Sequence, residues 1–90
     1  MAAHKADQIF QTIDAREWRP PEPMLRTLEA LDLLPKGQKL IMLIHSEPRP
    51  LFRILKLNGF DYRCKFIESG YFEVIIWHAE DTSATSASLE

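Results

Sequence analysis

Hydrophobic and polar residues alternate along the chain in two different periods. Apolar residues recur at three- and four-residue spacing in two segments, which predicts two amphipathic helices. The apolar side of the first, which begins near Met24 and stops at Pro35-Lys36-Gly37, consists of Leu25, Leu28, Leu31 and Leu34, and that of the second consists of Leu51, Ile54 and Leu55. Four other segments are short and rich in β-branched and aromatic residues, as strands are, and they cover residues 9–13, 39–45, 61–67 and 71–78. The predicted order of elements is therefore β-α-β-α-β-β.

The strands differ in how their apolar residues are distributed. Residues 39–45 and 71–78 are apolar on both alternating faces, which is typical of central strands, whereas residues 61–67 alternate charged and apolar side chains as an edge strand does. A β-α-β crossover makes the first two strands parallel, and a turn at Glu68–Gly70 makes the last two antiparallel. These features predict a two-layer α/β sandwich, in which two helices cover one face of a four-stranded mixed sheet.

The sheet face without helices should keep several large apolar side chains, whichever face that is. Residues 40, 42 and 44 point to one face and residues 41, 43 and 45 to the other, and both sets are mainly apolar. Exposed apolar patches usually mark interaction surfaces, so a partner or a second copy could bind there. Alternatively, the N-terminal tail and the stems of charged side chains could cover this face.

Length and composition bound the class of protein. Ninety residues suit a single domain, which we expect over residues 9–79, with disordered polar tails at 1–8 and 80–90. The final Leu89-Glu90 could be a cloning remnant. No apolar run is long enough to span a membrane and no signal-peptide core is present, so we expect a cytoplasmic protein. The net charge of −2 argues against general binding to nucleic acid.

The residues that commonly bind metals or react as nucleophiles are few. Cys64 is the only cysteine, and its place in an alternating strand predicts a buried, structural side chain. His45 and His78 end two antiparallel strands at opposite edges of the sheet, and His4 lies in the N-terminal tail. Dedicated metal sites need three or four converging ligands, so we expect neither a metal site nor a cofactor.

Two proline-rich segments open the predicted helices. The first contains Pro20, Pro21 and Pro23, and the second contains Pro48 and Pro50. Proline is tolerated in a first helical turn because amides there lack partners within the helix. It also removes the N–H groups with which a helix N-terminus holds phosphate. The segments therefore disfavour a nucleotide site built from main-chain groups.

Charged side chains gather around these segments, at the edge where the first two strands end. Ligands bind beyond the carboxyl ends of strands in open α/β sheets, so this edge is the candidate binding site for a ligand or partner. We expect ion pairs between Glu22 and Arg49, and between Glu47 and either Arg16 or Arg19. The alternative is an exposed lattice of ion pairs that adds little stability. The candidate binding residues are Arg16, Arg19, Glu22, His45, Glu47 and Arg49.

Taken together, these motifs resemble the TusA (SirA-like) sulfur-carrier family over roughly residues 13–77. The resemblance rests on Asp14-Ala-Arg, on Arg19-Pro-Pro-Glu-Pro-Met-Leu, and on His45-Ser-Glu-Pro with the later Gly59. Sulfur carriers read Arg-Cys-Pro-x-Pro at the start of the first helix, and Pro20 stands at the position of their cysteine. The resemblance thus implies the carriers' fold without persulfide transfer at this position. It is strongest to an uncharacterised bacterial branch with proline there.

Three functional hypotheses follow from the sequence. The first is a non-enzymatic binding or adaptor domain, without catalytic residues, that engages a protein partner or a small acidic ligand at the proline segments or the open sheet face. The second is a role in sulfur transfer or redox metabolism, which would require a reactive Cys64. The third is RNA binding, as in similarly folded translation-factor domains, which the net charge disfavours.

Overall fold

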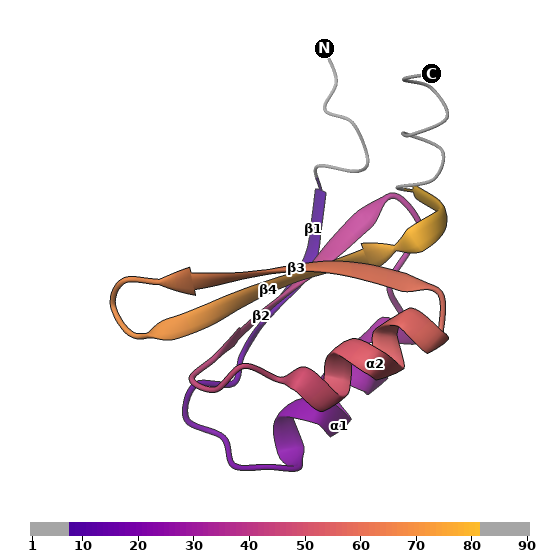
Figure 1. Ribbon diagram of the computed structural model, residues 1–90. Helices are drawn as coiled ribbons and strands as arrows, with labels where there is room; N and C mark the ends of the chain where they lie inside the picture. The colour runs from indigo at the N-terminus through magenta and orange to yellow at the C-terminus, as the bar shows by residue number, and fades with distance from the viewer. Residues whose placement is uncertain (1–7, 82–90) are drawn as a thin grey trace.

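The computed structural model of the chain describes residues 8–81. Six elements follow one another in the predicted order, as Figure 1 shows. They are β1 (Gln8–Asp14), α1 (Glu22–Leu31), β2 (Gln38–Ile44), α2 (Arg49–Leu57), β3 (Phe60–Ile67) and β4 (Tyr71–His78).

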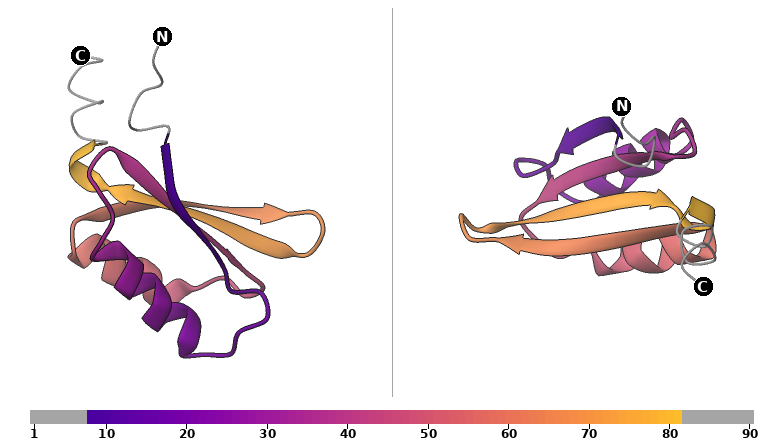
Figure 2. Two further views of the ribbon diagram at one scale, coloured as in Figure 1. Left: turned by 180° about the vertical axis from the view of Figure 1, so that it is seen from behind. Right: turned by 90° about the horizontal axis from the view of Figure 1, so that it is seen from above.

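The four strands form one mixed sheet in the order β1-β2-β4-β3. Strand β1 pairs with β2 in parallel, whereas β2 with β4 and β3 with β4 pair antiparallel. Both helices lie on the same face of this sheet (Figures 1 and 2). The predicted two-layer sandwich with β2 and β4 in the centre is therefore confirmed.

The hydrophobic core lies between the sheet and the helices. Leu40 and Met42 of β2, together with Val74 and Ile76 of β4, have no exposed surface. Leu55 of α2 packs onto this floor and is also completely buried. The sequence did not decide which face of the sheet the helices cover. In the structure, the even-numbered residues of β2 and β4 face the helices.

The opposite face of the sheet carries apolar and charged side chains in mixed rows. One row across the strands runs from Thr12 through Ile41 and Ile75 to Arg63, and both isoleucines are half-buried. No helix within residues 8–81 covers this face (Figure 2). Its use as a surface for a partner or for self-association stays a prediction.

Helix α1 differs from its predicted course. It ends at Leu31. Two hydrogen bonds of the 3₁₀ type then tighten the chain: the Leu33 amide donates to the Ala30 carbonyl, and the Leu34 amide donates to the Leu31 carbonyl. The tightened turn buries Leu34 in the core while leaving Leu33 exposed. Leu25, which we expected on the buried side of the helix, is 55% exposed.

The ends of the described chain extend slightly past the predicted domain. Gln8 begins β1, the carboxylate of Glu80 pairs with Lys36, and Asp81 accepts a hydrogen bond from the Gly37 amide. The other residues of both predicted tails lie outside the described range. Within residues 8–81, no helix has the length and hydropathy needed to cross a membrane.

Candidate functional site

The candidate site lies at the edge of the molecule where β1 and β2 end and where both helices begin (Figure 1). The two ends of the described chain lie at the opposite edge, since Gln8 is paired with Gln38 and Asp81 contacts Gly37. The fold therefore brings the predicted segments together, as expected from the parallel pairing of β1 with β2.

One part of this edge is an ion pair at the end of β1. The Arg16 guanidinium donates two hydrogen bonds to the Asp14 carboxylate, from Nε to Oδ1 at 2.8 Å and from Nη2 to Oδ2 at 2.7 Å. The Arg16 backbone amide donates a third, at 3.2 Å. These bonds favour the ionised carboxylate and lower the pKa of Asp14 to about 2. Arg16 also lies 4.8 Å from the centre of the Tyr71 ring, which fixes its orientation.

His45 lies beside this ion pair and bridges to the turn between β3 and β4. Its Nδ1 donates a hydrogen bond to the Gly70 carbonyl oxygen at 3.1 Å. The side chain is exposed and adds a weak favourable charge interaction to Asp14. His45 therefore joins the end of β2 to a turn, which is the structural alternative to a role in binding.

The second part of this edge is an apolar pocket, which we call the proline pocket. It has a volume of about 290 Å³ and is lined by five of the six prolines in the chain. Met42 and Leu51 form its buried floor, and Ser46 and Glu47 lie at its mouth. The remaining lining residues are Pro20, Pro21, Pro23, Met24, Ile44, Pro48 and Pro50.

The candidate charged residues pair within their own segments, so both ion pairs predicted between segments are wrong. Glu22 pairs with Arg26 one helical turn later, at 3.4 Å, and Glu47 pairs with Arg49 at 3.2 Å. Pairs two or four residues apart form without closing a long loop, so local partners outcompete distant ones. Arg19 makes no ion pair with the residues that the structure describes.

Cys64 lies in β3 on the face covered by the helices. It packs against the core, opposite Val74 of β4, but it is only partly buried, whereas the sequence predicted a buried side chain. Burial raises the pKa of its thiol, and the negative charge of Glu47 raises it further. The neutral thiol is therefore favoured, and the neutral form is a weak nucleophile and a weak metal ligand.

Among residues 8–81, the structure contains no cluster of three or more His, Cys, Asp or Glu side chains suited to a metal ion. His45 and His78 lie at opposite ends of the sheet, and His78 donates from Nε2 to the Leu34 carbonyl oxygen at 2.8 Å. His4 falls outside the described residues.

Sequence reasoning identified the prolines but missed the pocket that they form together. The sequence predicted the proline segments at the candidate binding edge but not that their rings form one apolar pocket. The detectable signal was that both segments occupy equivalent positions, each between a strand and a helix, on neighbouring parallel strands. Apolar rings at two such junctions must face each other across the gap between the helices.

Comparisons with known proteins agree with this architecture. No curated protein matches the chain significantly. The crystal structure of a SirA-like protein from Desulfitobacterium hafniense is similar, with a TM-score of 0.67 and 24% sequence identity, over 74% of this chain and 95% of that one. That likeness establishes the fold. Residues 12–78 match the family described as uncharacterized conserved protein (DUF2249), and the chain belongs to this family.

Proposed function

We propose that this chain is a non-enzymatic, cytoplasmic binding domain, and that its proline pocket holds an apolar side chain of a protein partner. The observation that carries the proposal is the composition of the pocket. Five prolines surround a floor of Met42 and Leu51, and polar side chains occur only at the mouth. A volume of about 290 Å³ is at the lower limit of ligand pockets and suits one side chain better than a cofactor.

The surroundings of the pocket favour an apolar occupant over a small acidic ligand. Prolines lack the N–H groups that bind anions at helix N-termini. Arg16 and Arg49 already contact carboxylates, which leaves Arg19 as the one candidate arginine without an ion pair among residues 8–81. Along this edge the four acidic residues balance the four basic ones: Asp14, Glu17, Glu22 and Glu47 against Arg16, Arg19, Arg26 and Arg49.

Sulfur transfer is the second candidate, because the chain shares the fold of a SirA-like protein. We infer that Pro20 occupies the position of the carriers' cysteine, and proline has no sulfur to load. Cys64 would have to replace it, yet burial and the charge of Glu47 both raise the pKa of that thiol. The chemistry of these two residues favours the binding domain.

A nuclear magnetic resonance titration tests the proposal. N-acetyl-leucinamide serves as the apolar probe, and sulfate serves as the acidic one. We expect the leucine derivative to bind with a dissociation constant on the order of millimolar, the range for a ligand of this size. It should shift the amide signals of Met24, Ser46 and Leu51, whereas sulfate should leave them in place.

Two matched variants give this titration its control. Ser46→Phe places a ring at the mouth of the pocket and should weaken binding of the leucine derivative by at least about tenfold. Ser69→Phe adds the same ring at an exposed turn that does not line the pocket and should leave binding unchanged. Equal binding by both variants, or stronger shifts with sulfate, would show that the pocket is not the binding site.

A further inference from the structure

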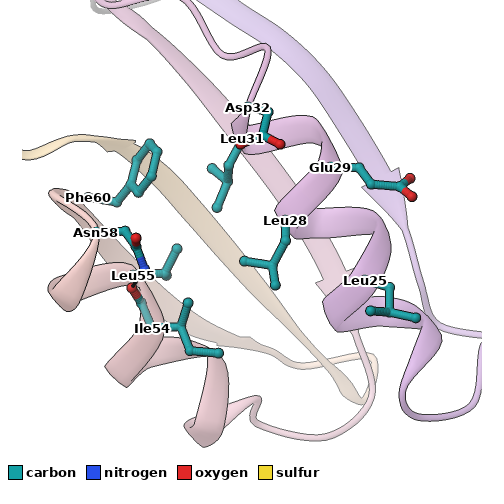
Figure 3. Close-up of a pocket in the computed structure, with 9 residues that line it drawn as sticks. All are labelled: Leu25, Leu28, Glu29, Leu31, Asp32, Ile54, Leu55, Asn58 and Phe60. Carbon is teal, nitrogen blue, oxygen red and sulfur yellow. Dashed lines mark hydrogen bonds between the residues drawn. The ribbon is translucent and has the colours of Figure 1, made fainter.

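A larger groove separates the two helices and shares no lining residue with the proline pocket. Its volume is about 600 Å³. Side chains of α1 and α2 face each other across it, and the first residue of β3 closes one end (Figure 3). The apolar lining residues are Leu25, Leu28, Leu31, Ile54, Leu55 and Phe60.

The groove combines a buried apolar floor with an exposed apolar wall. Leu55 is completely buried and Leu31 is 5% exposed, so the floor belongs to the core. Leu25 on the wall is 55% exposed, which leaves much of a large apolar side chain in water. Covering such a side chain with a partner removes apolar surface from water and favours association.

The charges that border the groove are of one sign. Glu29 and Asp32 of α1 are among the lining residues, with the Glu29 carboxylate at the outer rim on the β1 side (Figure 3), and no basic side chain lines the groove. Neither carboxylate forms an ion pair with the described part of the chain. On α2, two cations adjoin the lining residues: Lys56 is already bound to Asp61 at 2.9 Å, and Arg53, next to Ile54, does not line the groove. The α1 side of the groove therefore complements a basic partner.

The polar groups of the groove do not call for a small polar ligand. The Asn58 amide donates to the Ile54 carbonyl of its own helix at 2.8 Å. Among the described residues, no buried side-chain nitrogen or oxygen lacks a hydrogen-bond partner. Small-molecule sites usually present a few convergent polar groups, and this groove offers apolar surface with acidic residues on one side.

The length of the groove matches a short helix. The α1 wall runs from Leu25 to Asp32, which at about 1.5 Å per residue is roughly 12 Å long, and the α2 wall runs from Ile54 to Asn58, roughly 7 Å. A helix of about two turns spans the longer wall and presents apolar side chains at every third or fourth position.

We infer that this groove docks an amphipathic helix of a protein partner, with apolar anchors facing the floor and lysine or arginine residues along the flank next to Glu29 and Asp32. The inference goes beyond the proposed function, because it uses none of the residues of the proline pocket. It gives the domain a second contact surface, and an adaptor that joins two partners needs two such surfaces.

Two synthetic peptides test this inference on the full chain. Both are amphipathic helices of about twelve residues with the same leucine positions, and one carries lysine on its polar face where the other carries glutamate. Fluorescence anisotropy of the labelled peptides measures binding. The lysine peptide should bind at least about tenfold more tightly than the glutamate peptide, and its advantage should decrease as salt is added.

Substitutions at two exposed leucines locate the site. Leu25→Ser should weaken binding of the lysine peptide by about fivefold or more, because Leu25 lines the groove. Leu57→Ser should change binding by less than about twofold, since Leu57 is 78% exposed on α2 and lies outside the groove. Both side chains are exposed, so both variants should unfold at the same denaturant concentration as the natural chain.

A double variant tests the role of the acidic side chains, and two results would overturn the inference. Glu29→Gln combined with Asp32→Asn should abolish the preference for the lysine peptide. Equal binding of the two peptides, or equal effects of the two leucine substitutions, would overturn the inference. A natural chain that dimerises in sedimentation, and becomes monomeric with Leu25→Ser, would assign the groove to a second copy instead.

Discussion

Proline side chains at the start of both helices supply apolar surface but neither a hydrogen-bond donor nor a nucleophile. Pro20, Pro21 and Pro23 meet Pro48 and Pro50 across one pocket, and this arrangement accounts for the unusual proline content of both segments. A reactive site would need a group that can take up or release a proton or an electron pair. The five prolines supply no such group.

The acid behaviour of Asp14 is a prediction at the scale of one residue. The Arg16 guanidinium lowers the folded-state pKa of Asp14 from 3.8 to about 2. A carboxyl group with a lowered pKa stabilises the fold above its unfolded-state pKa, and this contribution is lost as the pH falls from about 3.8 to about 2. A carbon-detected titration of the Asp14 carboxyl group should give a midpoint near the lower value.

The matched variant for this prediction is Arg16→Gln. It removes the positive charge while keeping a polar side chain, and it should return the pKa of Asp14 to its ordinary range. If the pKa of Asp14 is near 3.8 in the natural chain as well, the ion pair between Arg16 and Asp14 does not form in solution.

The sequence predicted correctly which charged residues lie at one edge of the molecule, but it predicted the wrong ion pairs between them. The order of elements brings Asp14, Arg16 and His45 to one edge, because parallel strands end together. Which arginine pairs with which carboxylate depends on side-chain rotamers, which the sequence does not give. In the structure, each carboxylate pairs with an arginine close to it in the sequence. Thr27 shows the same limit: it is completely buried and donates from Oγ1 to the Met42 sulfur at 3.1 Å, and a lone threonine in a helix gives no such signal.

At the scale of elements, strands were easier to predict than helix faces. Strand β4 begins and ends where its apolar pattern predicts, at Tyr71 and His78. The spacing of leucines in α1 indicated a helix correctly but placed Leu25 on the buried side. A helix that borders a groove has apolar residues on more than its core-facing side, so the hydrophobic period alone does not distinguish the two.

The end of α2 gives a prediction about stability. Gly59 has a φ of +85°, a conformation in which a side chain is strained even though no atom lies near the position of its Cβ. Gly59→Ala should lower the free energy of unfolding by about 1 kcal/mol, measured by chemical denaturation. Gly59→Asn should lower the free energy of unfolding by less, because asparagine tolerates this conformation better than alanine. Identical unfolding midpoints for the Gly59→Ala variant and the natural chain would contradict a left-handed conformation at this position.

At the scale of the whole molecule, topology was predictable because few arrangements satisfy the pattern. Two helices that each follow a strand must lie on the sheet, and the two most apolar strands must occupy its centre. The pockets were not predictable in this way, since they arise from side chains that meet across the gap between α1 and α2. Both proposed contact surfaces lie on the helix side, and the open sheet face adds a third surface whose role stays a prediction.

The reactivity of the only thiol in the chain distinguishes a binding domain from a sulfur carrier most directly. Native protein is treated with a chromogenic disulfide and, separately, with a persulfide donor followed by intact-mass analysis, beside an unfolded control. Because burial raises the pKa of Cys64, we predict a slow reaction in the native state, a fast one after unfolding, and no bound sulfur. Fast native reaction with persulfide formed on Cys64 would contradict this and identify the chain as a sulfur carrier with a relocated cysteine.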